Sequence, residues 1–169
     1  MEIRRASPED AAEIAAVNIR AWQVAYTGIV PADLLSGMSL EKRTVFWTRE
    51  LADNRNKVVV AVENGKVVGW ASGGKGRDAD TKKESEVFAI YVSPDHWTRG
   101  IGRQLMMKIE DELTPSQGVT LWVLERNQSA IGFYLKIGYE FDGAEKTIQI
   151  GGKSLSELRL RKKASASPG

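Results

Sequence analysis

The feature that most constrains this chain is a glycine turn between an apolar run and an amphipathic segment. Residues 92–102 read VSPDHWTRGIG, so Gly100 and Gly102 follow the end of a predicted strand and open a predicted helix. Residues without a Cβ let the backbone approach a ligand closely and point consecutive amides at it. The first turn of a helix leaves amides unpaired at its positive dipole end, and Arg99 and Arg103 add full charges there. The turn therefore predicts a cradle for a diphosphate group.

The composition predicts one globular domain. The chain has 169 residues, of which 42% are apolar and 27% are charged, which is enough to bury a substantial core. We expect this domain over residues 1–163 and a flexible tail over 164–169. The first residues hold no apolar leader region, and no stretch approaches the ~18 apolar residues of a membrane span. The sequence thus predicts a cytoplasmic protein without a membrane partner.

Composition also disfavours several kinds of site. The chain has no cysteine, which excludes a disulfide, a thiolate metal site and a cysteine nucleophile. Its single histidine, His96, makes a histidine-based metal site unexpected, so we predict no metal. The net charge is only +2, and the basic residues near the C-terminus are not interleaved with aromatic ones. Nucleic acid is therefore not an expected partner.

Periodicity and turn residues predict the order of the elements. Ser7-Pro8 is typical of a helix start, Asn64-Gly65 of a two-residue hairpin turn, Pro115 of a helix end and Gly138 of a left-handed helix cap. We expect strands over residues 2–6, 58–62, 67–72, 85–92 and 119–124, helices over 7–26, 40–51, 102–113 and 127–136, and two last strands from Tyr139 that meet at Gly151-Gly152. Residues 77–84 are polar and predict a solvated loop.

This order predicts an α/β fold of the α+β type. We expect a mixed, mostly antiparallel and twisted sheet of about seven strands, with helices on both faces. The unit 85–124 requires a right-handed crossover through a helix, so its two strands should be parallel and central. Ligands favour the ends of such strands.

Two common phosphate-binding patterns do not fit the turn. The dinucleotide fingerprint needs a third glycine where this chain has Leu105, and no Gly-Lys-Ser/Thr sequence is present. A different pattern does fit. Arg99-Gly100-x-Gly102, followed by Asn127 and by the run 133–139, FYLKIGY, resembles the GNAT superfamily of acyl-CoA-dependent N-acyltransferases. This resemblance covers most of the chain and implies acetyl-CoA as the cosubstrate.

The resemblance implies a binding role for residues on three elements. The cofactor-binding residues it implies are Ile90, Tyr91, Val92, Thr98, Arg99, Gly100, Ile101, Gly102, Arg103, Asn127, Ser129 and Phe133. The strand residues among them offer main-chain groups to an extended ligand arm. Asn127 also suits a helix cap. Trp97 stands where the family usually has Gln or Arg, which removes one side-chain contact but leaves the backbone cradle.

Family chemistry implies direct attack of an amine on a thioester, for which the sequence offers two catalytic candidates. Tyr134 occupies the position of the general acid and would protonate the departing thiolate, the alternative being an aromatic side chain that packs against strands. Glu86 is the candidate base, because alternation places it on one face with Phe88 and Ile90. The alternative is a solvated strand-end carboxylate. Trp122 replaces another base used by some relatives, and Glu125 is a weaker candidate.

The acceptor is less constrained by the sequence. Trp22 and Tyr26 stand four apart on the first helix and are candidate substrate-binding residues, with core packing as the alternative. A polyamine, an aminoglycoside, an amino acid or a protein amine all fit, so the expected partner is a small-molecule or peptide amine. The family often forms homodimers, and a non-catalytic acyl-CoA sensor is the alternative function.

Overall fold

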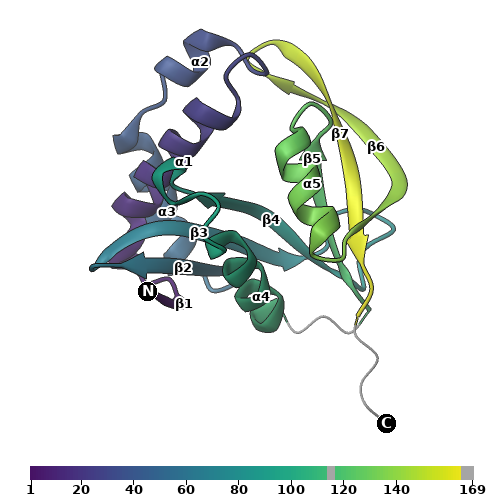
Figure 1. Ribbon diagram of the computed structural model, residues 1–169, viewed down its shortest axis with the longest axis horizontal. Coiled ribbons are helices and arrows are strands. Elements are labelled where there is room, and N and C mark those ends of the chain that lie inside the picture. The colour runs from purple at the N-terminus through teal and green to yellow at the C-terminus, as the bar shows by residue number, and fades with distance from the viewer. Residues whose placement is uncertain (114–116, 165–169) are drawn as a thin grey trace.

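The computed structural model describes residues 1–113 and 117–164. Its helices pack on one mixed sheet (Figure 1). The predicted helix end at Pro115 and the tail residues 165–169 lie outside the described residues. In chain order the elements are β1 (Glu2–Arg5), a 3-10 turn (Pro8–Asp10), α1 (Ala11–Ala25), α2 (Ala32–Ser36), α3 (Leu40–Ala52), β2 (Lys57–Glu63), β3 (Lys66–Lys75), β4 (Ser85–Val92), a second 3-10 turn (Pro94–His96), α4 (Ile101–Leu113), β5 (Val119–Leu124), α5 (Gln128–Lys136), β6 (Glu140–Ile150) and β7 (Lys153–Lys162).

The sheet has the predicted mixed topology. Among the described residues its strand order is β1-β2-β3-β4-β5-β7-β6. Only β4 and β5 run parallel, and α4 connects them, whereas the other neighbouring strands pair antiparallel. This confirms the predicted fold class of seven strands around a central parallel pair.

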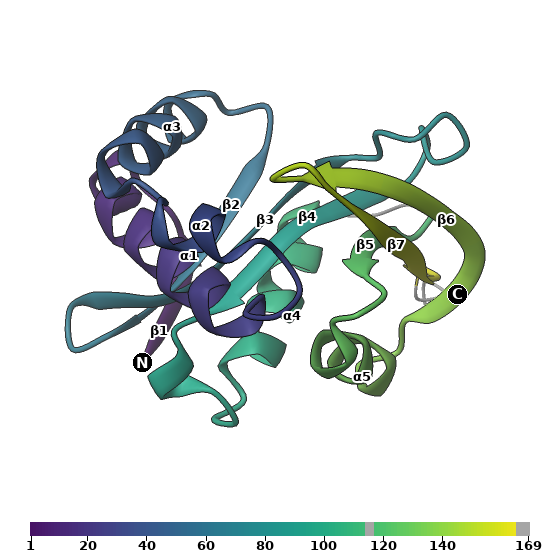
Figure 2. The same cartoon turned by 90° about the horizontal axis from the view of Figure 1, so that it is seen from above.

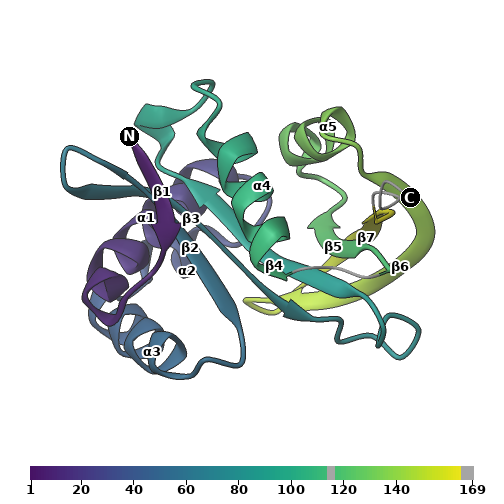
Figure 3. The ribbon, with the colours of Figure 1, turned by 90° about the horizontal axis from the view of Figure 1, so that it is seen from below.

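Helices cover both faces of the sheet. Figure 3 shows α4 and α5 on one face and α1 and α3 on the other. Leu105, Met106 and Ile109 of α4 are almost fully buried against the sheet, as their three-and-four spacing predicts. Each such side chain contributes about 1.5–3 kcal/mol by leaving water. No helix in residues 1–113 and 117–164 has the length and apolar character needed to cross a membrane.

An apolar cluster connects the segment after α1 with the last strands of the sheet. Seen from above, the β6–β7 hairpin extends over the sheet toward α2 (Figure 2). Val30 and Leu35, from the loop after α1 and from α2, pack there with Leu124 of β5 and Leu155 of β7. The hairpin therefore closes one end of the sheet face on which α1 lies.

A β-bulge at Phe88 changes which face the residues of β4 occupy. Ala89 pairs with Ser72, and Val87 with Gly73, which leaves Phe88 as an extra residue between them. Val87 and Ile90 consequently both pack in the core that contains α4, although they are three residues apart. The prediction that Ile90 shares a face with Glu86 is therefore wrong, because a bulge shifts the alternation by one residue.

The faces on either side of the bulge follow from the neighbouring glycines. A Cβ at Gly73 would meet Leu113 of α4, whereas a Cβ at Gly74, opposite Glu86, would meet the Phe88 ring instead. Glu86 and Phe88 thus point away from α4. Tyr91 packs with the cluster beneath α1 and α3 and so lies on this same face.

β4 and β5 part where the bulge begins. Their parallel ladder includes Ser85, Glu86 and Val87 of β4, and it ends at Leu121 of β5. β4 nevertheless continues to Val92, so the edge of β4 beyond Val87 that faces β5 has no partner strand among the described residues. The bulge and this open edge lie together, as is common beside active sites.

The remaining differences between expectation and structure are local. The hairpin turn is confirmed, because Asn64 and Gly65 both have positive φ, at 52° and 75°. The strand predicted over 67–72 extends to Lys75, and the short helix α2 was not predicted. The prediction that the loop 77–84 is solvated is not fully correct. Thr81 is completely buried, and charged side chains of the loop form ion pairs.

Candidate functional site

The glycine turn forms a run of free backbone amides. Thr98 and Gly100 have positive φ, at 63° and 76°, which turns successive amides in one direction before α4 begins. The first helical bond of α4 runs from the Gln104 amide to the Gly100 carbonyl, at 3.2 Å. The amides of residues 98–103 donate to no acceptor among the described residues. They form a nest of amides at a helix N-terminus, which is an arrangement that favours anions.

Close packing around Gly102 favours a residue without a side chain beside the free amides. A Cβ there would lie 3.3 Å from the Phe133 ring of α5 and 4.0 Å from Val92 of β4. The first turn of α4, the end of β4 and α5 thus converge at a position where a Cβ would be tight against the Phe133 ring. A diphosphate approaching the amides fits this arrangement, because it meets backbone rather than side chains.

The side chains of the turn differ in the contacts that they make. Arg99 binds Glu63 at the end of β2, through two hydrogen bonds of 2.7 and 3.0 Å. Arg103 is exposed and pairs with no described carboxylate. Trp97 donates its indole N–H to the Val92 carbonyl at 2.8 Å and so caps the end of β4. The residue that departs from the family pattern therefore has a structural contact of its own.

The open edge of β4 leads from the bulge to this turn. Ile90, Tyr91 and Val92, the strand residues expected to bind an extended arm, all lie on this segment. On the far side, Asn127 caps α5 by accepting from the Ala130 amide at 3.3 Å. Ser129 is exposed in the first turn of α5. The edge, the turn and α5 thus bring the predicted cofactor-binding residues together.

Tyr134 lies on α5, at the point where the two strands part. The residue is buried, and its hydroxyl makes no hydrogen bond to another described residue. Burial, and secondarily the nearby Tyr26 hydroxyl of α1, raise the pKa of Tyr134. Tyr134 and Tyr26 thus lie close enough for their hydroxyls to interact electrostatically, although α5 and α1 cover opposite faces of the sheet.

Trp22 and Tyr26 of α1 form an aromatic wall with Tyr91 of β4. Their ring centroids are 4.9 Å apart for Trp22 and Tyr26, and 6.5 Å apart for each of them and Tyr91. The hydroxyls of Tyr26 and Tyr91 are hydrogen-bonded at 3.1 Å. Burial raises the pKa of both groups, so both are neutral near neutral pH. The wall combines packing with a polar tip, and the substrate-binding role of Trp22 and Tyr26 stays a prediction.

Glu86 is buried and firmly held. Its side chain is 1% exposed, and it accepts from the Arg77 amide at 3.0 Å and from the Arg77 guanidinium at 2.7 and 3.2 Å. This arrangement satisfies the buried carboxylate, although the side chain of Arg77 itself is 61% exposed. Glu86 thus shares a face with Phe88 but not with Ile90, it is not the solvated carboxylate of the alternative, and it is already engaged by a cation that the sequence did not connect to it.

A buried arginine fixes the loop that carries Arg77. Arg159 of β7 is 5% exposed and binds Asp78 and Asp80 of the loop, as well as Asp142 of β6. Asp78 also accepts from the Trp122 indole at 2.9 Å. This network explains why the loop is not solvated, and it gives Trp122 a structural role in place of the carboxylate found in some relatives.

Three charged residues near the aromatic wall were missed by the sequence analysis. Glu157 of β7 pairs with Lys146 of β6 at 3.6 Å, and the Lys146 ammonium lies 4.2 Å over the Trp122 ring. Arg43 of α3 lies 5.8 Å over Trp22 and makes no ion pair with a described residue. Alternation within β7 was the signal available for Glu157, whereas nothing local marks Arg43. The weaker base candidate, Glu125, is exposed.

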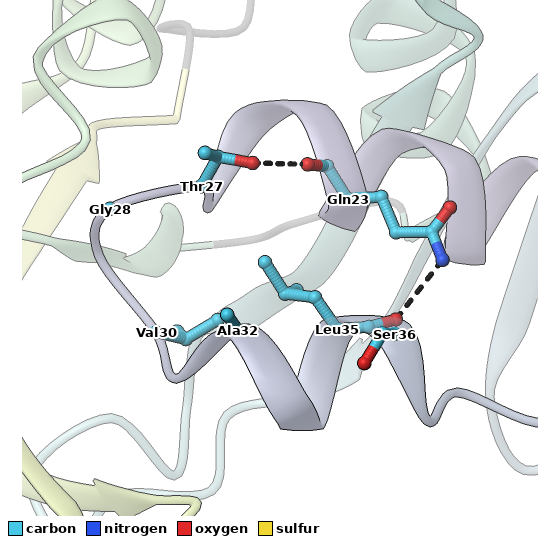
Figure 4. A pocket seen from close by; sticks show the side chains of 7 residues that line it. All are labelled: Gln23, Thr27, Gly28, Val30, Ala32, Leu35 and Ser36. Atoms are coloured by element: carbon cyan, nitrogen blue, oxygen red, sulfur yellow. Dashed lines mark hydrogen bonds between the residues drawn. The ribbon is translucent and has the colours of Figure 1, made fainter.

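A separate hollow of about 290 Å³ lies between α1 and α2. Figure 4 shows that two of its polar side chains are already paired, because Gln23 donates to the Leu35 carbonyl at 3.0 Å and Thr27 donates to the Gln23 carbonyl at 2.5 Å. None of the predicted site residues lines it. The hollow is therefore not part of the candidate site.

Known proteins resemble this chain over most of its length. The family model described as "Acetyltransferase (GNAT) family" matches residues 19–139. The uncharacterized N-acetyltransferase YuaI of Bacillus subtilis is 32% identical over 94% of this chain and 90% of its own length. The L-amino acid N-acyltransferase MnaT of Escherichia coli is 31% identical over 82% of this chain and 79% of its own. The crystal structure of PaiA N-acetyltransferase from Thermoplasma acidophilum in complex with coenzyme A has the same fold, with a TM-score of 0.75 at 20% identity over 96% of this chain and 98% of that one.

Proposed function

Because this chain belongs to the GNAT acetyltransferase family, we propose that it transfers the acetyl group of acetyl-CoA to the α-amino group of an amino acid. N-acetyl transfer from acetyl-CoA is the activity of the family. The acceptor and the role of each residue are the proposed part. The relatives support a transferase and give no support to a non-catalytic sensor. A cytoplasmic location and a homodimer stay predictions from the sequence.

One observation carries the proposal: the run of unpaired amides over residues 98–103 follows directly on the open edge of β4. The amides bind the diphosphate of coenzyme A, with Arg103 as a neighbouring positive charge. The edge from Ile90 to Val92 binds the extended arm by strand-like hydrogen bonds. Together they direct the thioester toward the opening between β4 and β5, where Tyr134 lies.

Tyr134 is proposed as the general acid. When bound, acetyl-CoA supplies an acetyl thioester, on which the amine forms a carbon–nitrogen bond while the carbon–sulfur bond breaks. Burial keeps the Tyr134 phenol protonated near neutral pH, and its hydroxyl is not used by a described residue. It is therefore available to give its proton to the departing thiolate.

The amino-acid acceptor is proposed from two features of the α1 face. The aromatic wall of Trp22, Tyr26 and Tyr91 suits a small apolar side chain. Arg43, half-buried at the edge of this wall, provides a guanidinium for a carboxylate. The name of MnaT, which is an L-amino acid N-acyltransferase, points to the same acceptor class.

The test compares amino acids with the amines that their decarboxylation yields. Released thiol is followed while purified protein is mixed with acetyl-CoA and both sets of amines. We expect turnover with amino acids, and we expect Arg43→Met to raise their KM about tenfold while leaving the KM of the decarboxylated amines unchanged. Arg49→Met, on the exposed surface of the same helix, is the matched control and should change neither.

Other outcomes separate the alternatives. Equal use of both sets by the wild type would show that the acceptor carboxylate is not recognised. Turnover only with lysine-containing peptides would replace the amino acid by a protein amine. Tight binding of coenzyme A without turnover on any amine would favour the sensor.

A further inference from the structure

Glu157 lies on the same sheet face as the aromatic wall. Leu155, two residues before it on β7, packs in the cluster that contains Tyr26. Arg159, two residues after it, lies 5.6 Å from the Trp122 ring. Residues two apart on a strand share a face. The side chain of Glu157 thus projects between these two flanking contacts, level with Leu124, the last residue of β5.

Glu157 interacts electrostatically with titratable groups of several elements. Its carboxylate raises the pKa of Tyr26 on α1, after the larger effect of burial. In turn, the charges of Lys146 on β6, and of Arg77 and Glu86 at β4, act on Glu157. Glu157 also pairs in register with Leu124, which packs in one cluster with Trp22 and Tyr26, so it lies on β7 beside the aromatic wall.

Glu157 differs from the other carboxylates of this face in how weakly it is held. Glu86 accepts three hydrogen bonds from Arg77, and Asp78 and Asp142 bind the Arg159 guanidinium. Among the described residues, the Glu157 carboxylate has one ion pair, of 3.6 Å, to a lysine whose side chain is 40% exposed. Burial nevertheless raises the pKa of Glu157 above its ordinary value, so the group is both desolvated and free to exchange a proton.

We propose that Glu157 binds the ammonium group of the acceptor and takes its proton before the amine attacks. The inference rests on the proposed function, because it names the base of that reaction. One proton passes from the acceptor ammonium to the Glu157 carboxylate, which leaves a neutral amine. The amine nitrogen forms the bond to the acetyl carbon, the carbon–sulfur bond breaks, and the thiolate takes the Tyr134 proton. Glu86 then serves as the buried counter-ion that orders Arg77.

The first test is Glu157→Gln, which keeps the shape of the side chain and removes its charge. We expect kcat/KM for the amine to fall by about 100-fold or more at neutral pH, with the Kd of coenzyme A unchanged. Glu145→Gln, an exposed carboxylate on the neighbouring strand β6, is the matched control and should keep wild-type activity. Glu86→Gln is run in parallel, because the sequence analysis made Glu86 the candidate base.

The second test uses the pH profile, which a purely structural role of Glu157 would not move. Glu157 must be ionised to accept a proton, so kcat/KM falls on the acid side as the carboxylate becomes protonated. Lys146 lowers the pKa of Glu157. Lys146→Met should therefore move the acid limb of the profile to higher pH, while the Met chain retains contact with Trp122. Glu157→Gln should abolish that limb.

Each outcome decides between the inference and the wider function. If the wild type acetylates amines and Glu157→Gln stays within about threefold of it, the inference is overturned while the transferase stands. Loss of activity in Glu86→Gln together with an unmoved acid limb in Lys146→Met would assign the base to Glu86.

If Glu157→Gln does not fold, the acid limb of Lys146→Met decides alone, because an unmoved limb overturns the inference and a shifted limb supports it. Absence of turnover by the wild type on every amine would refute the proposed function itself, and the inference with it.

Discussion

The two halves of the site are built from different materials. The half expected to hold coenzyme A consists of backbone: the amides of residues 98–103 and the open edge of β4. The half expected to hold the acceptor consists of side chains from α1, β4 and β7, held together by ion pairs and aromatic contacts. Backbone groups present the same chemistry whatever the local sequence, whereas the side-chain half depends on which residues meet. This difference predicts that some substitutions will weaken the binding of coenzyme A alone, and that others will weaken the recognition of the acceptor alone.

The largest expected effect tests the residue between the two halves. Tyr134→Phe removes the proposed proton donor while retaining the buried ring, so we expect kcat to fall about 1,000-fold with the Kd of coenzyme A unchanged. Tyr139→Phe is the matched control. The Tyr139 hydroxyl is also in a buried side chain, but it donates to Glu110 at 2.7 Å, so its loss should lower stability without lowering kcat. An equal loss of kcat in both variants would mean that Tyr134 acts through packing.

The second prediction concerns the ion pairs of the acceptor half. Arg159→Met leaves Asp142 and Asp78 without their guanidinium, so the free energy of unfolding should fall by about 3 kcal/mol in denaturant titrations. The KM of the acceptor should rise, because the loop that holds Arg77 loses its anchor, whereas the Kd of coenzyme A should not change. Arg161→Met removes a more exposed neighbour with longer contacts and should cost about 1 kcal/mol or less.

The same ion pairs predict a dependence of stability on pH. The Arg159 guanidinium lowers the pKa of Asp80 to about 2, below its ordinary value. A depressed carboxyl pKa contributes stability above the unfolded value, near 4, which is lost as the pH falls through the folded value. Wild-type stability should therefore decline between about pH 4 and pH 2, and Arg159→Met should flatten this decline. Acid unfolding followed by circular dichroism measures both.

The third prediction tests the backbone half. Gly102→Val places a branched side chain against the Phe133 ring and within the run of free amides, so we expect the Kd of coenzyme A to rise about 30-fold by calorimetry. Gln104→Val puts the same residue at an exposed position of the same helix and should leave the Kd within about twofold. If Gly102→Val bound coenzyme A normally, the amides would not be the diphosphate site.

The sequence predicted the two halves unequally well. The glycine turn, the order of the elements and the parallel pair could be inferred, because Gly100, Asn64-Gly65 and the apolar periodicities act locally. The bulge at Phe88 could not, because it depends on pairing with β3 rather than on the composition of β4. The roles of Arg77 and Glu157 were missed for a related reason: the groups they interact with, Glu86 and Tyr26, lie on other elements, and only the folded chain brings them near.

The smallest expected effect lies in the aromatic wall itself. Tyr26→Phe removes the 3.1 Å hydrogen bond to the Tyr91 hydroxyl while retaining the ring that packs on Trp22. A neutral hydrogen bond of this kind contributes about 1 kcal/mol, so the KM of the acceptor should rise about fivefold. Thr27→Val, an exposed change in the next residue, should leave that KM unaltered. If the Kd of coenzyme A rose in Tyr26→Phe instead, the aromatic wall would serve the cosubstrate. The division between a backbone half and a side-chain half would then no longer hold, because one aromatic pair would bind both reactants.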